Sequence, residues 1–293
     1  MSFRTVAIKT QAKLEFRQNY MIVRSKNETI KVYISEISVL IIENTAVCIT
    51  AVLLQELIKK KITVIFCDNE RNPCSNLIPF YGSHDNSEKI RTQITWKDDI
   101  KNKIWTEIVK EKVRKQGQLV SLLKIEDEGY YIDKVSEITI NDEKNIEAQV
   151  AKKYFHHLFG NNFVRDSETS INSALNYGYM ILLSLFNREV TKRGYLTQLG
   201  INHESIRNSF NLSCDLMEPF RPIVDGTVIC LDLDSSFTSA NKHDVLDMFN
   251  KILIINNKAY CLADAIDIYC SSIFKAINQK DINLIEFYDY GEK

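Results

Sequence analysis

The sequence predicts an α+β protein, in which a β-rich N-terminal domain precedes a larger all-α C-terminal domain. Up to about residue 80 the hydrophobic residues alternate or form short apolar runs, whereas after about residue 95 they recur with helical spacing. Between these regions lies a polar, turn-rich stretch that includes Gly82, Asp85 and Asn86. A chain of 293 residues is long enough for two hydrophobic cores. We therefore expect domains at 1–80 and 96–293, joined by a linker at 81–95.

The N-terminal domain is expected to be mostly antiparallel sheet with one crossover helix. Leu14 and Phe16 alternate with charged residues, which is the period of a half-buried strand. A helix should begin after Thr50, a suitable N-cap, and end near Lys60, where lysines complement the helix dipole. The other expected strands are 30–34, 38–42 and 62–66.

The C-terminal domain is expected to contain only helices. Lys97 to Leu123 has the pattern of a long amphipathic helix that carries many lysines. Further helical segments are expected at 146–159, 171–192, 203–209, 215–225, 244–252 and 261–277. The sequence has neither Gly-x-Gly-x-x-Gly nor a phosphate-loop motif, so it gives no support for nucleoside triphosphate binding.

The distribution of charge along the chain and the spacing of the cysteines limit the classes of function that the sequence supports. Residues 1–125 carry 21 Lys and Arg against 13 Asp and Glu, whereas residues 126–293 carry 16 against 25. A basic N-terminal half fits a phosphate-binding surface, although an ordinary solvated surface explains it equally well. The seven cysteines include no Cys-x-x-Cys pair, so neither a disulfide framework nor a zinc knuckle is indicated. Without a signal-like N-terminus or a long apolar run, the protein is expected to be cytoplasmic.

Glu147 occupies a position in segment 146–159 where a helix should have an apolar side chain. At about 100° per residue, Val150, Tyr154 and Leu158 fall within roughly 60° of it. A carboxylate in an apolar stripe is costly unless it is paired, hydrogen-bonded or bound to a cation. The sequence leaves open a cation site, a buried ion pair, or a stripe edge exposed in a groove.

A second group of polar residues lies downstream. His203 precedes a run in which Asp215 and Glu218 have i,i+3 spacing, so both would face one side of a helical turn. Pro219 and Pro222 each remove a backbone donor from this run. The alternative for the two acids is a capping box with Asp215 as the N-cap, and a lone histidine is more often structural than a ligand.

Four motifs occur in order along the chain: Glu147 in its helix, Asn-Tyr-Gly at 176–178, Gly-x-x-His ending at His203, and Asp-Leu-Met-Glu-Pro-Phe-Arg at 215–221. In this combination the chain resembles, over essentially its whole length, the CRISPR-associated spacer-integration nuclease family, Cas protein one. The overall length and the amino-acid sequence of the last motif are most similar to those of the compact type II form.

The resemblance implies that Glu147, His203 and Glu218 are catalytic and bind one divalent metal, Mg²⁺ or Mn²⁺. Two carboxylates and an imidazole suit these ions and lack the thiolates of a structural zinc site. The implied reaction is attack by the 3′-hydroxyl of a short foreign DNA fragment on a phosphodiester at the edge of a CRISPR repeat. The same site would cleave DNA with water as the nucleophile. This is the adaptation stage of CRISPR antiviral defence.

The resemblance also implies partners. They are double-stranded DNA, as fragment and repeat, a second copy of the chain joined through the β-rich domain, and a dimer of the small Cas protein two. For the type II form they include the effector nuclease and an accessory ring protein. Two other functions remain open: a stand-alone metal-dependent repair or transposon-type nuclease, and a catalytically silent DNA-binding scaffold.

For several other residues the sequence supports a role in the site or in DNA binding less strongly. Asp215 and Tyr177 are candidate supporting residues, and for Tyr177 a place in the core is the favoured alternative to a DNA contact. His156 and His157 point away from Glu147 on the helical wheel, so neither is expected to be a ligand. A solvated helix face is the favoured interpretation, over a DNA path, for Lys101, Lys103, Lys110, Lys112, Arg114 and Lys115.

Overall fold

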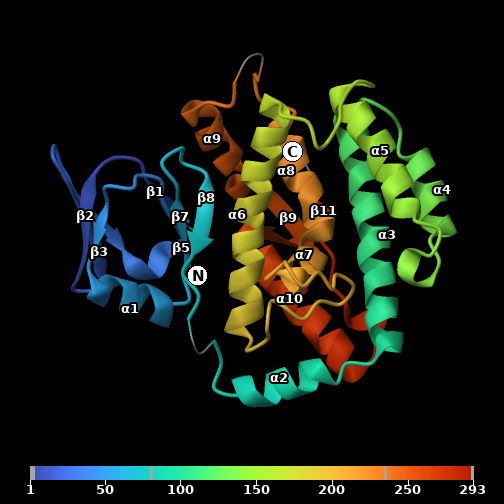
Figure 1. Ribbon diagram of the computed structural model, residues 1–293, viewed down its shortest axis with the longest axis horizontal. Helices are drawn as coiled ribbons and strands as arrows, with labels where there is room; N and C mark the ends of the chain where they lie inside the picture. Colours follow the sequence, from blue (N-terminus) through green and yellow to red (C-terminus); the bar gives the residue numbers. More distant parts are fainter. Residues whose placement is uncertain (1–3, 80–81, 234–235, 292–293) are drawn as a thin grey trace.

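The computed structural model describes residues 4–79, 82–233 and 236–291. Figure 1 shows the strand-rich N-terminal part, in blue, beside the group of helices that makes up most of the molecule. The predicted α+β class, with strands first and helices after, is confirmed. The domain boundaries themselves stay a prediction.

Two four-stranded sheets form the N-terminal part. One has the order β1-β5-β7-β8 and the other β4-β3-β2-β6. The bounds are β1 (Arg4–Ile8), β2 (Ala12–Arg17), β3 (Tyr20–Ser25), β4 (Thr29–Tyr33), β5 (Ile37–Ile42), β6 (Cys48–Ile49), β7 (Thr63–Cys67) and β8 (Pro73–Asn76). Helix α1 (Ala51–Lys59) connects β6 to β7, and the Thr50 hydroxyl accepts the Leu53 N–H at 3.4 Å, as predicted for an N-cap.

The expectation of a mostly antiparallel sheet is wrong for the first sheet, because β1, β5 and β7 are parallel to one another. Strands β2, β3 and β4 pair antiparallel in the second sheet, so the chain returns to β5 in the direction of β1. Helix α1 then supplies the crossover that a parallel β5–β7 pair requires.

The first sheet is apolar on both faces and links the two parts of the molecule. Leu40 and Val64 point into a small core with α1 and the second sheet. Val39, Ile41 and Ile65 alternate with them and join the larger core of the helical part. Each such fully buried aliphatic side chain contributes roughly 1.5–3 kcal/mol. Figure 1 shows β7 and β8 beside the long helix α6, where this shared core lies.

The rest of the chain is mainly helical. Its elements are α2 (Asn86–Ile94), α3 (Asp98–Leu122), α4 (Gly129–Glu137), η2 (Ile140–Asp142), α5 (Ile146–Phe159), α6 (Ser170–Lys192), α7 (Asn211–Met217), η3 (Glu218–Phe220), α8 (Arg221–Val228), α9 (Ser239–Val245), η4 (Leu246–Asn250), α10 (Leu262–Gln279) and η5 (Ile282–Leu284). Strands β9 (Ile252–Ile255), β10 (Lys258–Cys261) and β11 (Asp289–Tyr290) form a small sheet. None of the helices among the described residues is long and apolar enough to cross a membrane.

Two details of the C-terminal prediction need correction, and the stretch that is expected to be a linker contains a helix. The region is not all-α, because it includes the β10-β9-β11 sheet. The stretch 81–95 contains helix α2, whose buried Gln93 bonds the carbonyls of Leu196 and Leu199. Segment 203–209 forms turns instead of a helix. The long helix expected from Lys97 to Leu123 is confirmed as α3.

Helix α3 is surrounded by α4, α5, α8, η3 and α10. The expectation that all of its basic residues lie on a solvated face is therefore partly wrong. Lys112 and Lys115 are buried, at 8% and 1% exposed. Lys115 Nζ lies 3.0 Å from Glu111 Oε1 and 2.9 Å from Asp289 Oδ1. The other four basic residues keep more of their side chains in solvent.

Candidate active site

Two carboxylates meet at Lys112, where α3, α5 and η3 come together. Glu147 lies in the first turn of α5, and Glu218 begins the short 3₁₀ turn η3. Pro219 and Pro222 explain this turn, because both interrupt the hydrogen bonding that would continue α7 into α8. The ammonium of Lys112 donates to Glu147 Oε1 and, at 2.5 Å, to Glu218 Oε2. The two carboxylate oxygens are therefore separated by no more than two hydrogen-bond lengths.

The charges of this cluster stabilise one another against burial. Burial alone would raise the pKa of Glu218, but Arg221 and Lys112 outweigh it and lower that pKa to about 2. Burial would lower the pKa of Lys112, and the Glu218 and Glu147 charges outweigh this effect and raise it. Arg221 Nε holds the second oxygen of Glu218 at 2.8 Å. Glu147 is the more open acid, with 26% of its side chain exposed against 6% for Glu218.

His203 is held in one orientation by Asp215. The Asp215 carboxylate is fully buried and accepts the backbone N–H groups of Ile201, Asn202 and His203 at 2.6, 2.9 and 3.1 Å. Its Oδ1 also lies 2.5 Å from His203 Nδ1. A carboxylate on Nδ1 favours the tautomer that leaves Nε2 free to bind a ligand. The capping-box alternative is not observed, because Asp215 lies inside α7 and not at its start.

The structure places His203 near the paired acids. Its pKa is raised chiefly by the hydrogen bond to Asp215, with further contributions from the negative charges of Glu218 and Glu147. The ring stands edge-on to Trp105 of α3, 5.7 Å between centroids. Glu147, His203 and Glu218, which are 56 and 15 residues apart in sequence, are thus brought into one region of the molecule.

A buried network extends from the site through α8 and α6. The Arg221 guanidinium lies 4.7 Å from the centre of the Tyr179 ring. The Tyr179 hydroxyl donates to Asp225, which also accepts the Tyr154 hydroxyl at 2.7 Å. Tyr154 belongs to the same helix as Glu147. The network therefore connects the residue that holds Glu218 to the helix that carries Glu147.

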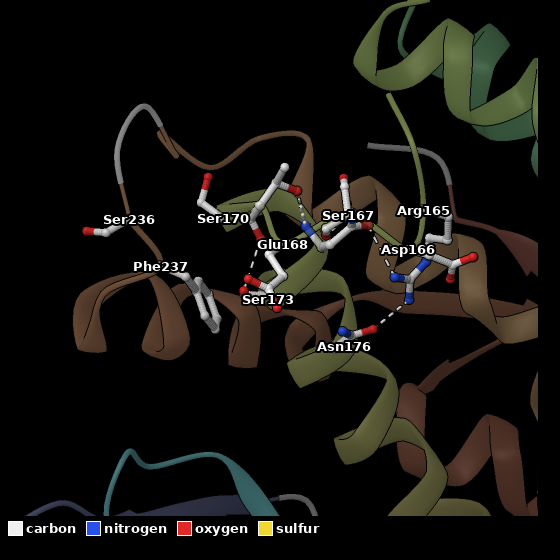
Figure 2. A pocket seen from close by; sticks show the side chains of 11 residues that line it. Arg165, Asp166, Ser167, Glu168, Ser170, Ser173, Asn176, Ser236 and Phe237 are labelled. Atoms are coloured by element: carbon white, nitrogen blue, oxygen red, sulfur yellow. Dashed lines mark hydrogen bonds between the residues drawn. The ribbon is translucent and has the colours of Figure 1, made fainter. Parts of the chain in front are cut away.

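A surface cavity of about 840 Å³ adjoins this network at the start of α6. Figure 2 shows the Arg165 guanidinium beside Asn176, to which it donates at 2.7 Å. Arg165 also lies 5.4 Å from the centre of the Tyr179 ring. Arg165 and Arg221 are thus both cation–π partners of Tyr179. Neither Glu147, His203 nor Glu218 lines the cavity.

Tyr177 lies in the hydrophobic core, which is the interpretation that the sequence favoured over a DNA contact. It is 3% exposed, and its ring lies 5.5 Å from that of Phe237. Lys242 approaches the same ring at 5.8 Å. Burial, with the nearby Cys67 and Glu43, raises the pKa of its hydroxyl. Its described neighbours belong to the side facing the N-terminal sheet and do not include Glu147, His203 or Glu218.

Two carboxylates and an imidazole are residue types that suit a divalent cation, but their arrangement in the described residues is not that of a metal site. Among the described residues, no three His, Cys, Asp or Glu side chains are arranged to hold a metal ion. The position between Glu147 and Glu218 nevertheless already holds a positive charge, that of Lys112. Carboxylate oxygens with one imidazole nitrogen are suitable ligands for Mg²⁺ or Mn²⁺. That Glu147, Glu218 and Nε2 of His203 hold such an ion stays a prediction.

A family model for the CRISPR associated protein Cas1 matches residues 6–239. The chain belongs to the Cas1 family. It is similar to the CRISPR-associated endonuclease Cas1 of Neisseria meningitidis serogroup C, with 30% identity over 286 residues, 96% of this chain and 94% of the relative. Its fold is similar to that of a casposase bound to an integration product, with a TM-score of 0.75, 17% identity, and 96% and 92% of the two chains covered. It is also similar to a chain of a Cas6-RT-Cas1–Cas2 complex, with a TM-score of 0.72, 16% identity, and 99% and 36% covered.

Sequence reasoning did not assign three residues to this candidate site: Lys112, which it interpreted as part of a solvated helix face, and Arg221 and Asp225. A signal existed for Lys112, which is spaced seven residues from both Trp105 and Leu119 and so lies on the buried face of α3. Arg221 and Asp225 show no such signal, because their partners come from helices whose relative positions only the fold determines.

Proposed function

We propose that this Cas1-family protein is a metal-dependent DNA endonuclease and integrase that inserts short foreign DNA fragments into a CRISPR array. The observation that carries the proposal is the pair Glu147 and Glu218, which share one cation beside His203. A purely structural acid pair would not need a half-exposed imidazole, held by a buried carboxylate, next to it.

Each residue has a distinct role in this proposal. Glu147, Glu218 and His203 Nε2 would bind Mg²⁺ or Mn²⁺, and Asp215 keeps the imidazole in the binding tautomer. Arg221 fixes Glu218 through its other oxygen. When bound, a divalent ion polarises the phosphate and stabilises charge on the attacking or leaving oxygen.

The proposed reaction keeps the number of phosphodiester bonds unchanged. The 3′-oxygen of the fragment forms a bond to the repeat phosphorus while the bond from that phosphorus to the repeat's own 3′-oxygen breaks. The attacking hydroxyl loses its proton, and the leaving oxygen gains one. One phosphodiester is exchanged for another, so no external energy source is needed. With water as the nucleophile, the same site hydrolyses DNA.

The proposed partners are DNA, a Cas2 dimer and a second copy of this chain. The fold similarities to a casposase bound to an integration product and to a Cas1–Cas2 complex are consistent with DNA and Cas2 as partners. The outer strand β4 supports self-association, because Tyr20, Ile30 and Tyr33 are all exposed on this sheet. A monomer by light scattering at tens of micromolar would contradict the homodimer. The proposed type II form, with its effector nuclease and ring protein, rests on the overall length of the chain and on the sequence of residues 215–221.

The test is a joining reaction that contains the purified protein, Cas2, short duplex DNA with free 3′ ends, a repeat-bearing plasmid and Mn²⁺. Wild type should form joined product, and Glu147→Gln or Glu218→Gln should not. Glu107→Gln is the matched control, because Glu107 pairs with Lys110 on α3 and does not contact the site. Product from both site variants would refute the assignment. Joining without repeat DNA or Cas2 would favour the transposon-type nuclease, and no joining by wild type would favour the silent scaffold.

A further inference from the structure

Lys112 occupies the position between the two site carboxylates. Its side chain leaves the centre of α3 and is 8% exposed. It contacts Glu147 and Glu218, which approach from α5 and η3. Nζ therefore lies where two separate elements direct negative charge, as a bound cation would.

The oxygens that Lys112 holds are those that a metal would need. Arg221 already binds Oε1 of Glu218, and Lys112 binds Oε2, on the side of Glu147. A divalent ion shared by the two acids would lie about 2.0–2.6 Å from their oxygens. An ammonium at 2.5 Å from Glu218 Oε2 takes up the same space, so both cations cannot be there together.

We propose that Lys112 is a built-in counter-ion, which holds the metal position in the metal-free protein and is displaced when a divalent ion binds. This inference rests on the proposed metal site. It assigns Lys112 two tasks: to hold Glu147 and Glu218 close together before metal arrives, and to lower the apparent metal affinity by competing for their oxygens. Without a counter-ion, two carboxylates this close together would repel each other.

A static ion pair is the alternative explanation, and it makes the opposite prediction for metal binding. If Lys112 stayed in place and supported the carboxylates, its removal would disorder them and weaken metal binding. If Lys112 competes, its removal frees both carboxylates, and metal binds more tightly.

The test compares Lys112→Met with wild type by isothermal titration of the full-length protein with MnCl₂ and by melting curves with and without Mn²⁺. The matched control is Lys110→Met, because Lys110 lies on the same helix, is half-buried and pairs with Glu107 outside the site. We expect Lys112→Met to bind Mn²⁺ roughly tenfold more tightly or better, whereas Lys110→Met keeps the wild-type affinity. We also expect a lower melting temperature without metal and a larger rise on adding Mn²⁺.

Each outcome decides the question. A Kd for Lys112→Met equal to or weaker than that of wild type overturns the inference. If the variant folds only when Mn²⁺ is present, the counter-ion role is supported; if it is unfolded with and without Mn²⁺, Lys112 is structural and the inference fails. Glu147→Gln and Glu218→Gln separate this result from the proposed function: wild-type Mn²⁺ affinity in both would show that the metal site itself is misplaced.

Discussion

Replacing Asp225 by asparagine should stabilise the protein at neutral and alkaline pH and leave its stability nearly unchanged near pH 4. The Asp225 carboxyl on α8 is 1% exposed and accepts the hydroxyls of Tyr154 and Tyr179. Burial raises its pKa to about 6, because the two hydrogen bonds and the nearby Arg221 offset the loss of solvation only in part. The charged form is therefore disfavoured in the folded protein.

The direction and size of the effect follow from this pKa. Between about pH 3.8 and 6 the unfolded chain releases the Asp225 proton while the folded protein keeps it, so the free energy of unfolding falls as the pH rises. A difference of about two units corresponds to about 3 kcal/mol, reached in full above pH 6. The neutral asparagine amide avoids this loss, and it can accept from one tyrosine and donate to the other. For a chain of this size the variant should melt up to roughly 6–12 °C higher at pH 8.

The assay is urea unfolding of wild type and Asp225→Asn at pH 4, 5, 6, 7 and 8, with the difference between the two plotted against pH. This difference removes the contribution of every other titrating group. The control is Asp232→Asn, a change at an exposed residue shortly after α8. A difference that stays constant from pH 4 to 8, or a variant less stable than wild type at pH 8, would refute the reasoning.

Three further substitutions test other contacts of the site. Glu147→Gln should abolish DNA joining and the Mn²⁺-induced rise in melting temperature, with little change in the metal-free midpoint; a large fall in that midpoint, with joining retained, would make Glu147 structural. Asp215→Asn removes the carboxylate that orients His203 and should weaken Mn²⁺ binding by about 10–100-fold in a titration, and an unchanged affinity would contradict this role. Tyr288→Phe loses the 2.9 Å bond to the Pro219 carbonyl and should reduce the free energy of unfolding by about 1 kcal/mol in urea, whereas no change would show that this bond contributes little.

Local patterns in the sequence predicted much of the fold. Helices α1, α3, α5 and α6 were predictable from the helical spacing of their hydrophobic residues and from a cap or charged residues at their ends. Pairing between strands could not be predicted in the same way. Strand β5 is buried along its whole length, and an apolar run of this kind does not reveal the direction of its neighbours. The parallel β1–β5 pair depends on a contact across the β2–β4 hairpins.

The candidate site likewise contains residues that local patterns predict and residues that only the packing of the helices brings together. Glu147 was predictable because a charge in an apolar stripe needs a partner, and the structure supplies one in Lys112. The same argument applies to Lys112, but a lysine-rich helix made a solvated face the simpler interpretation. The identity of the partner was beyond local reasoning, because Lys112 contacts acids 35 and 106 residues away in sequence. Such pairs are determined by how α3, α5 and η3 pack.

The charges around the site give this packing a functional consequence. Lys112 and Arg221 carry two positive charges, and Glu147 and Glu218 carry two negative ones, so the buried cluster is neutral without metal. Neutrality makes burial of four ionisable groups tolerable, since each charge has a partner. When a divalent ion takes the place of Lys112, the ion, Arg221 and the two acids form a site of net positive charge, which attracts the phosphates of DNA. The counter-ion arrangement therefore predicts that DNA affinity at this site depends on metal in wild type, and that this dependence is steeper than in Glu147→Gln.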